Sequence, residues 1–420
     1  MPVPAADPRT EPLVRAAPKA SGRPRVALVH DWLVTLRGGE RVLDAFCELF
    51  PDATVFTLVR EPGVATDRIE AMEHRASFAD ALPMARQRHR WLLPLYPAAI
   101  QTLDLSEYDL VLSSSHCVAK AVIPGPGALH VCYCHTPVRY AWDRRDDYLR
   151  GTAPALQPLS PLLDVAARWL RRFDVQTLGR VDRFVANSAN TASKIEAFYG
   201  RSADVAPAPV ELSRFVDAPR RQPAPGGQGE ALAVDAPGYD LILGGLVPYK
   251  RVDLALAAWA QMPDRRLVIV GDGPEAARLQ RLAPANARMV GRVGEDALAH
   301  WYSGARSLVF PGEEDFGIVP LEAQAAGTPV LALGRGGALE TVRDGETGVL
   351  IADNTPEALI AGVARLDALA PSAEACRAHA ARFDRPAFLE RMRSILASAA
   401  DEAPALRRQT RLSRAGGVAP

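Results

Sequence analysis

The sequence predicts an α/β protein that consists of two doubly wound, Rossmann-like domains. Short apolar runs typical of buried parallel strands alternate with stretches of helical spacing, as in chains built from repeated βα units. These units form two series, at residues 25–215 and 239–386, and a segment at 216–238 rich in Pro, Gly, Gln and Ala separates them as a linker. A hydrophobic fraction of 48% over 420 residues is sufficient for a core in each domain.

The first domain follows residues 1–24, which are rich in Pro, Ala and Arg and are predicted to be a disordered tail. Its expected strands lie at 25–30, 53–56, 110–113, 128–133 and 183–186. After the first of these come Gly38 and Gly39, and residues 40–49 have helical spacing. A glycine pair before a helix favours phosphate binding, although a tight turn that requires glycine explains the pair equally well.

The second domain is expected to contain strands at 241–243, 266–269, 287–290, 307–310 and 330–333. Between the last two of these, residues 317–326 predict a helix, because Pro320 is tolerated in a first turn and Gly327 and Pro329 would end it. Strand, loop, helix and strand thus form one parallel crossover unit. The chain then ends in a predicted helix at 387–402 and a predicted disordered tail at 403–420.

The polar residues of this crossover unit are spaced to suit a ligand. Glu314 lies in the loop at the carboxyl end of a strand, where open α/β sheets bind ligands. The free N–H groups around Phe316, Gly317 and Ile318 would attract an anion to the start of the helix. Glu322 lies one turn after Ile318, where its carboxylate would accept hydrogen bonds from a ribose. The spacing predicts a nucleoside diphosphate site, with Glu314 directed towards the group that the diphosphate carries.

A family resemblance rests on the whole string from Gly312 to Gly327, Gly-Glu-Glu-Asp-Phe-Gly-Ile-Val-Pro-Leu-Glu-Ala-Gln-Ala-Ala-Gly. This string resembles the signature of retaining family 4 glycosyltransferases, which have the GT-B fold of two Rossmann-like domains facing each other across a cleft. The strings that begin at His30, Cys134 and Leu246 are similar to those of bacterial O-antigen and exopolysaccharide mannosyltransferases. The resemblance implies that the first domain faces the acceptor, that the second binds a nucleotide sugar, and that the helix at 387–402 crosses back to the first domain.

The resemblance also implies roles for residues that mean little alone. His135 follows an expected strand and would lie near the transferred sugar, although an isolated histidine is more often structural. Lys250 and Arg251 would neutralise the diphosphate, for which arginine offers a two-pronged contact. Family members usually carry an arginine five or six residues before this lysine, where this chain has Gly245. Either Arg251 or an arginine of the first domain, such as Arg37, replaces it, or the diphosphate is held less tightly.

A second glycine motif leaves an alternative open. The run from Gly271 to Ala276 has the G-x-G-x-x-A form of a dinucleotide turn, which taken alone would predict NAD. The motif follows a later strand of the domain than the strand that Lys250 follows. A structural turn near the nucleotide is therefore the preferred interpretation. The resemblance places the nucleobase one strand further on, against the backbone around Val293. Glu295 would accept a hydrogen bond from the edge of a guanine base there, which favours a GDP-sugar.

Composition limits the partners and the location. Lys+Arg and Asp+Glu both count 49, so net charge gives no argument for nucleic acid. Five cysteines without a C-x-x-C pair fit a reducing cytoplasm, and no apolar run reaches the roughly 18 residues of a membrane span. The segments 86–96 and 168–172 are both basic and aromatic, which suits either the inner face of an anionic membrane or a solvated helix face.

The expected function is transfer of a hexosyl group, with retention, from a nucleotide sugar to a glycan or lipid-linked glycan in cell-surface polysaccharide synthesis. His135, Glu314 and Lys250 are the expected catalytic residues, and GDP-mannose is the expected donor, with a UDP-sugar as the alternative. Neither a cofactor nor a metal ion is expected, since no D-x-D stands between strands. A glycoside hydrolase could use Glu314 and Glu322 as acid and base, but this would leave the anion site unexplained. An NAD-binding or catalytically silent nucleotide-binding protein is the other alternative.

Overall fold

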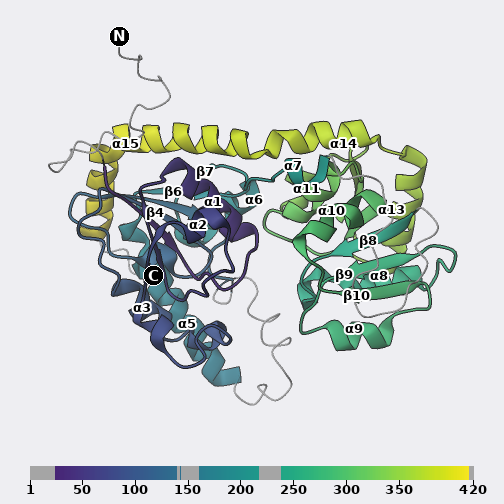
Figure 1. Cartoon of the computed structure of the whole chain (residues 1–420), viewed down its shortest axis with the longest axis horizontal. Helices are drawn as coiled ribbons and strands as arrows, with labels where there is room; N and C mark the ends of the chain where they lie inside the picture. The colour runs from purple at the N-terminus through teal and green to yellow at the C-terminus, as the bar shows by residue number, and fades with distance from the viewer. Residues whose placement is uncertain (1–23, 140–141, 143–159, 217–237, 416–420) are drawn as a thin grey trace, which may run out of the picture.

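The computed structural model describes residues 24–139, 142, 160–216 and 238–415. Two α/β domains lie side by side, and a long C-terminal helix runs along the first of them (Figure 1). The predicted tail at 1–24 and the predicted linker at 216–238 lie almost entirely outside the described residues. Among the described residues, no helix combines the length and the apolar character that crossing a membrane requires.

The first domain contains a parallel sheet of seven strands in the order β3-β2-β1-β4-β5-β6-β7. Its strands are β1 (Val26–His30), β2 (Thr54–Thr57), β3 (Glu73–Ala76), β4 (Leu110–Ser115), β5 (Leu129–Cys134), β6 (Arg183–Ala186) and β7 (Ala203–Val205). Its helices include α1 (Gly38–Leu49), α2 (Asp67–Glu70), α3 (Tyr96–Gln101), α5 (Ser160–Gln176), α6 (Ala189–Tyr199) and α7 (Ser213–Val216). The crossovers make the sheet parallel and leave its central strands buried on both faces.

The second domain contains a parallel sheet of six strands in the order β10-β9-β8-β11-β12-β13. Its strands are β8 (Tyr239–Leu243), β9 (Leu267–Val270), β10 (Ala287–Gly291), β11 (Ala305–Phe310), β12 (Val330–Leu333) and β13 (Gly348–Ile351). Its helices are α8 (Val252–Trp259), α9 (Ala276–Leu282), α10 (Glu295–Gly304), α11 (Ile318–Ala325), α12 (Ala338–Thr341), α13 (Pro356–Leu369) and α14 (Ala373–Ala380). Both domains therefore have the predicted doubly wound, Rossmann-like architecture.

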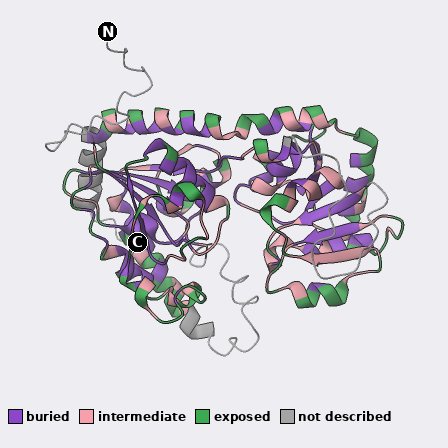
Figure 2. Cartoon of the chain, viewed as in Figure 1, coloured by how far each residue is buried: buried purple, intermediate pink, exposed green. Residues whose placement is uncertain are grey.

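Alternation along the strands builds an apolar layer on each side of each sheet. In β1, Leu28 packs into one core cluster while Ala27 and Val29 pack into another. Figure 2 shows the buried strands enclosed between helices in both domains. The cluster that contains Leu28 also includes Leu308 of β11, so the apolar core continues from one domain into the other.

All ten predicted strands are present, with ends shifted by at most two residues. The strands β3, β7 and β13 were not predicted, and all three are at sheet edges. An edge strand is short and needs little apolar sequence, and β3 (Glu-His-Arg-Ala) is mostly exposed. Local periodicity therefore carries no signal for β3, whereas β13 (Gly-Val-Leu-Ile) is apolar and mostly buried and was missed despite its sequence.

The final helix, α15 (Arg385–Ala415), is longer than predicted. The sequence predicted a helix at 387–402 and disorder at 403–420, whereas the helix continues to Ala415. The segment after Pro404 is rich in Ala, Leu and Arg, which are strong helix formers, and this accounts for the difference. The helix is held to the first domain by buried side chains such as Phe388, whose ring lies 5.9 Å from Phe46 of α1.

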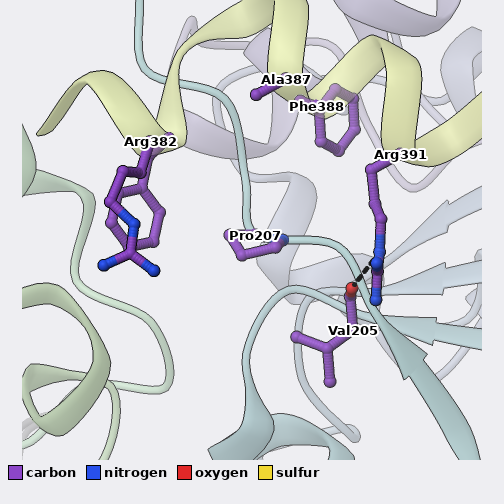
Figure 3. A pocket seen from close by; sticks show the side chains of 7 residues that line it. Val205, Pro207, Arg382, Ala387, Phe388 and Arg391 are labelled. Carbon is purple, nitrogen blue, oxygen red and sulfur yellow. Dashed lines mark hydrogen bonds between the residues drawn. The ribbon is translucent and has the colours of Figure 1, made fainter. Parts of the chain in front are cut away.

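The chain passes between the domains at two adjacent segments. Val210 donates a backbone hydrogen bond of 2.9 Å to Phe383, which pairs the connection before α7 with the segment before α15. A pocket of about 360 Å³ lies beside this crossing (Figure 3). Pro207 and Phe388 line it, and Arg391 donates a hydrogen bond of 3.2 Å to the Val205 carbonyl. The two crossing segments are thus held to each other and to α15 by hydrogen bonds.

Candidate functional site

The candidate site lies where the strand order of each sheet reverses. The reversal falls between β1 and β4 in the first domain, and between β8 and β11 in the second. Doubly wound sheets bind ligands at the carboxyl ends of strands at such a point. Several residues follow these strand ends: His30 ends β1, Gly244 follows β8, and the predicted Glu314 lies four residues after Phe310, the last residue of β11.

The signature helix α11 has the predicted form. Gly317 is its N-cap in a left-handed conformation, with φ of +90°, which a residue with a side chain adopts only under strain. Pro320 lies in the first turn, and Gly327 follows the helix with φ of +88°. The backbone N–H groups at the start of the helix are the part of this segment that could receive an anion.

Glu322 lies in the interior of the second domain. Its side chain is buried, and Tyr302 of α10 donates a hydrogen bond of 2.7 Å to Glu322 Oε2. Burial raises the pKa of the Glu322 carboxyl, and the Tyr302 hydrogen bond and the charges of Arg41 and Arg214 only partly oppose it. The carboxylate is therefore held in one orientation by a buried hydroxyl, a contact that the sequence did not predict.

Lys250 and Glu314 meet as a partly buried ion pair. Lys250 belongs to the turn after β8, so the pair joins the two strand ends at the point of reversal. Burial lowers the pKa of Lys250, but the neighbouring Glu314 outweighs this effect and raises the pKa overall. Lys250 is therefore charged at neutral pH and lies beside the residue that was predicted to contact the donor sugar.

Arg251 does not share this position. Its backbone is left-handed, with φ of +49°, and its guanidinium donates to Asp253 on its own helix, with Nε 3.2 Å from Oδ1. Arg139 of the first domain instead points at the second: Arg139 Nε donates to Asp315 at 2.9 Å, and its guanidinium lies 5.9 Å from the Tyr249 ring centroid. Arg139 is thus a first-domain arginine next to the Lys250 segment, whereas the sequence suggested Arg37 for this place.

Asp315 connects the two domains. Its carboxylate also pairs with Lys194 of α6 at 2.6 Å, and its carbonyl accepts from the Ser188 hydroxyl at 2.6 Å. Burial raises the pKa of Asp315, but Arg139 and Lys194 outweigh this and hold the pKa below its usual value. Asp315, the residue directly after Glu314, therefore holds the two domains together.

The glycine turn of the first domain faces the signature helix. A Cβ placed on Gly38 would lie 3.9 Å from Ile318 Cδ1 of α11. A Cβ placed on Gly39 would lie 3.5 Å from His30 and 3.8 Å from His135. The predicted residues Gly38, Gly39, His135 and Ile318 thus come together from both domains at one place.

His135 is part of a partly buried group of histidines at this place. Its Nε2 atom lies 2.8 Å from the Ser114 hydroxyl, and its ring lies 6.2 Å from that of His116. Burial, followed by the nearby His116, His30 and Arg139, holds the pKa of His135 well below its usual value. His135 is therefore neutral at neutral pH.

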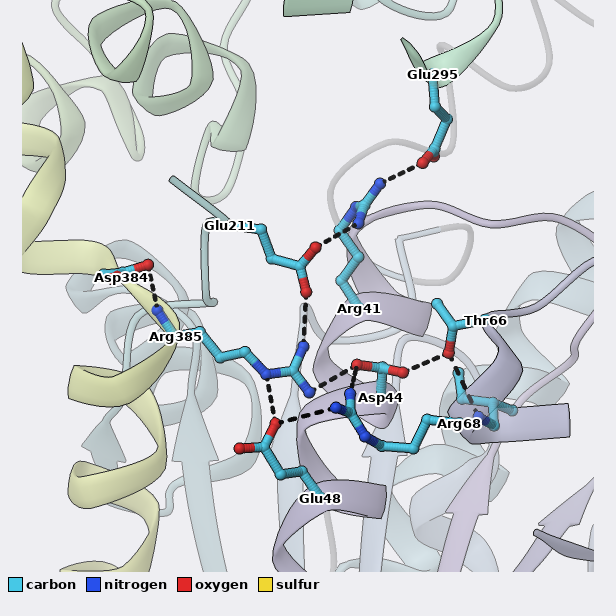
Figure 4. A network of polar contacts seen from close by, with 10 residues as sticks. Arg41, Asp44, Glu48, Thr66, Arg68, Glu211, Glu295, Asp384 and Arg385 are labelled. Carbon is cyan, nitrogen blue, oxygen red and sulfur yellow. Dashed lines mark hydrogen bonds and ion pairs between the residues drawn. The ribbon is translucent and has the colours of Figure 1, made fainter. Parts of the chain in front are cut away.

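Glu295 and Val293 lie at the domain junction. Glu295 begins α10 and pairs with Arg41 of α1 at 2.8 Å and with Arg214 of α7 at 3.2 Å. Figure 4 shows the network that continues from Arg41 through Glu211 to Arg385. Val293 is partly buried against the shared core. Glu295 thus pairs with two arginines at the position where a guanine was expected.

The turn from Gly271 to Ala276 is tightly packed against protein. A Cβ on Gly271 would lie 1.9 Å from the Gly244 carbonyl oxygen, and one on Gly273 would lie 2.4 Å from that of Leu246. The glycines are required because this turn presses against the segment that follows β8. This packing is the physical reason to interpret the motif as a structural turn.

Lys120 follows β4 but does not face the site. It is buried and pairs with Asp174 of α5 at 2.8 Å. Tyr199 and Trp142 also donate to Asp174, at 2.8 and 2.9 Å. Lys120 therefore belongs to a structural network inside the first domain.

Comparison with known proteins gives matches in both domains. The model of Glycosyltransferase Family 4 matches residues 36–214, and the model of Glycosyl transferases group 1 matches residues 234–383. Together these two matches span both domains. The chain belongs to the family 4 glycosyltransferases.

Curated relatives of this glycosyltransferase match part of its length. The D-inositol 3-phosphate glycosyltransferase of Streptomyces coelicolor is 36% identical over 217 residues, which is 44% of this chain and 47% of the relative. The enzyme of the same name from Geodermatophilus obscurus is 35% identical over 253 residues, 54% of this chain and 55% of the relative. The chain spans about half the length of the curated relatives it matches.

Solved structures agree on the fold of this glycosyltransferase. Anabaena HepE in complex with UDP and glucose superposes with a TM-score of 0.64 at 18% identity, covering 89% of this chain and 99% of that one. Sucrose-phosphate synthase from Thermosynechococcus elongatus superposes with a TM-score of 0.65 at 19% identity, covering 89% and 98%. The GT-B fold implied by the sequence is therefore confirmed.

Proposed function

We propose that this protein transfers a hexosyl group from a nucleoside diphosphate sugar to a glycan or lipid-linked glycan, with retention at the anomeric carbon. The observation that carries the proposal is the meeting of the Gly38–Gly39 turn, His135 and the start of α11, with the Lys250–Glu314 pair at the strand ends of the second domain. This arrangement offers positive charge and free N–H groups beside carboxylates, which suits a diphosphate linked to two sugars.

Each predicted residue has a role in this proposal. Lys250 and the N–H groups of Phe316, Gly317 and Ile318 stabilise the charge that develops on the departing diphosphate, without a metal ion. Glu322 holds the ribose, and Glu314 and His135 contact the donor sugar from two sides. The diphosphate itself takes the acceptor proton in a front-side substitution, so no covalent nucleophile is assigned.

Two further positive groups belong to the proposed diphosphate site. Arg251 lies next to Lys250, although it would have to leave Asp253 to reach a phosphate. Arg139 carries its charge beside Glu314 and Tyr249, and we propose it in place of Arg37 as the substitute for the arginine missing at Gly245. Loss of diphosphate affinity in Arg139→Gln but not in Arg37→Gln would support this assignment, and the reverse would contradict it.

The donor is proposed to be GDP-mannose, with a UDP-sugar as the competing donor. Sequence strings similar to those of mannosyltransferases support GDP-mannose, whereas a guanine contact at Glu295 would require that carboxylate to leave Arg41 and Arg214. The complex of Anabaena HepE with UDP and glucose is the reason to test UDP in parallel. Thermal shift against GDP, UDP, ADP and NAD, followed by donor hydrolysis, distinguishes these donors and also tests the NAD alternative.

The decisive test of the site uses Glu322→Ala. We expect the variant to fold and to lose affinity for the preferred nucleotide, because the ribose contact is removed. Glu346→Ala is the matched control, since Glu346 is an exposed glutamate of the same domain. Unchanged nucleotide affinity in Glu322→Ala would contradict the ribose role, and sugar release without any nucleotide would instead support a hydrolase.

We also propose that the first domain contacts a membrane when the acceptor is lipid-linked. Trp91 is 72% exposed, with the Arg88 guanidinium 4.4 Å from its ring centroid, and Trp169 of α5 is 48% exposed. Both segments pack on the same core cluster. Exposed aromatic and basic side chains suit an anionic surface. Sedimentation with anionic vesicles should weaken in a Trp91→Ser, Trp169→Ser double variant, and unchanged sedimentation would contradict the proposal.

A further inference from the structure

The hydroxyl of Ser114 links two imidazoles of the site. His30 and Ser114 are paired neighbours on β1 and β4, and His135 directly follows β5. Ser114 Oγ lies 3.0 Å from His30 Nδ1 and 2.8 Å from His135 Nε2. A hydroxyl has one proton and two lone pairs, so Ser114 can donate to only one of the two rings. If one ring presents a bare lone pair to Ser114, the hydroxyl donates to that ring and accepts from the other.

Glu40 decides the direction of this chain of hydrogen bonds. Its Oε1 atom lies 3.7 Å from His30 Nε2, and both side chains are buried. Burial raises the pKa of Glu40, but His30 and backbone hydrogen bonding outweigh it and lower the pKa overall, so Glu40 is a carboxylate at neutral pH. A bare lone pair on His30 Nε2 would face this negative charge. A neutral His30 therefore carries its proton on Nε2, which leaves Nδ1 to accept from Ser114.

The other charged groups around His135 do not change this reasoning. His116 lies on one side, with its Nδ1 atom 3.3 Å from Asp31 Oδ2, and Arg139 also acts on His135. The Asp31 carboxylate accepts from the backbone N–H groups of residues 116–119 at 2.7–2.8 Å, so it is fixed in place. Since His135 is neutral, it carries a single ring proton, and the structural question is which nitrogen holds it.

We propose that Glu40, His30 and Ser114 are positioning residues that set the tautomer of His135, with the proton on Nε2 and a lone pair on Nδ1. Ser114 accepts from His135 Nε2 and donates to His30 Nδ1. His135 Nδ1 makes no hydrogen bond within the described part of the chain, so it is available to accept from a hydroxyl of the donor sugar. This inference rests on the sugar-facing role proposed for His135.

The direct test is nitrogen NMR of the protein with labelled histidine, which reports the ring nitrogen that carries the proton. The chain has eight histidines, and the His135 signals are assigned by their loss in His135→Gln. We expect Nε2–H in the wild type and a mixture of tautomers in Ser114→Ala. Ser113→Ala is the matched control, because the neighbouring Ser113 hydroxyl bonds to His130 at 2.8 Å instead. A proton on Nδ1 in the wild type, or an unchanged tautomer in Ser114→Ala, would overturn the proposal.

Kinetics separate this proposal from the proposed function. We expect Ser114→Ala to lower kcat about fivefold, with a smaller change in KM for the donor, because one oriented hydrogen bond is lost. Ser114→Thr, which keeps the hydroxyl, should restore turnover. If His135→Ala retains full donor affinity and turnover, the sugar-facing role itself fails. If His135→Ala loses turnover while Ser114→Ala equals the wild type, only the positioning role fails.

Discussion

At the scale of single residues, Glu322 shows how a buried environment changes an ordinary side chain. Tyr302 orients its carboxylate, and burial raises its pKa above the usual 4.5. An ionised carboxylate is a better acceptor for ribose hydroxyls than the neutral acid, which has only one free carbonyl oxygen. The protonation state of Glu322 should therefore control nucleotide affinity.

We predict that nucleotide affinity falls on acidification at a pH above 4.5, where an exposed glutamate would still be ionised. The sign follows from the raised pKa, since the group gains its proton at a higher pH than usual. Isothermal titration of the preferred nucleotide over a pH series measures this. In Glu322→Gln the acid dependence should disappear, and a dependence that persists would assign it to another group.

Tyr302 gives a second prediction. Tyr302→Phe keeps the buried ring, which lies 5.7 Å from that of Phe215, and removes only the hydroxyl that orients Glu322. We expect the nucleotide Kd to rise about fivefold, the effect of one hydrogen bond of roughly 1 kcal/mol. The acid midpoint should also move to higher pH, because Tyr302 lowers the pKa of Glu322. An unchanged midpoint would show that the hydroxyl does not act on the carboxylate.

At the scale of elements, the glycine turns are determined by how closely segments approach. The turn after β9 has the sequence of a dinucleotide motif, yet Gly271 lies against the backbone of the segment after β8. Motif spacing alone cannot distinguish glycine that admits a ligand from glycine that admits another protein segment. That distinction depends on the neighbouring strand, which lies about 30 residues earlier in the chain.

Gly271→Ala should destabilise the protein by about 2 kcal/mol or more, because its Cβ would lie 1.9 Å from the Gly244 oxygen at a φ of +143°. Thermal or urea unfolding measures the change. Gly294→Ala is the control, since a Cβ there meets no atom within 4 Å and should cost little. Equal stability of the two variants would show that the contact is relieved without cost.

At the scale of the whole molecule, the two domains are joined by the paired crossing segments and by ion pairs across the junction. Asp315 of the second domain is buried between Arg139 and Lys194 of the first. Arg41 and Glu295 form a second link at the start of α1 and α10. A buried carboxylate with two cationic partners is costly to remove, since both cations are left uncompensated.

Asp315→Asn should therefore lower stability by about 3 kcal/mol, measured by urea unfolding at neutral pH. The pKa of Asp315 is lowered, so its contribution is present above the unfolded pKa of 3.8 and is lost as pH falls through the lower folded value. The stability difference between wild type and variant should shrink in that acid range. Glu346→Gln, which breaks an exposed pair with Arg343, should change stability by less than about 1 kcal/mol.

Local sequence was sufficient for most of the architecture. The strands of both sheets, the helix α11 with its proline and glycine ends, and the Gly38–Gly39 turn were predicted because apolar period and turn chemistry are short-range properties. The edge strands β3 and β7 and the full length of α15 were missed because they carry no apolar pattern, whereas β13 was missed although its residues are apolar. The approach of Gly38 to Ile318 was not predicted, because the two residues lie in different domains.

The pairing of charged groups was decided by the tertiary structure alone. Glu295 pairs with Arg41 across 254 positions of sequence, and Arg139 pairs with Asp315 across 176. Tyr302 reaches Glu322, and Ser114 joins His30 to His135, only because helices and strands from separate segments pack together. A sequence states which charges and hydroxyls a chain carries. Their partners depend on which elements the folded chain brings within about 3 Å, the distance at which a hydrogen bond forms.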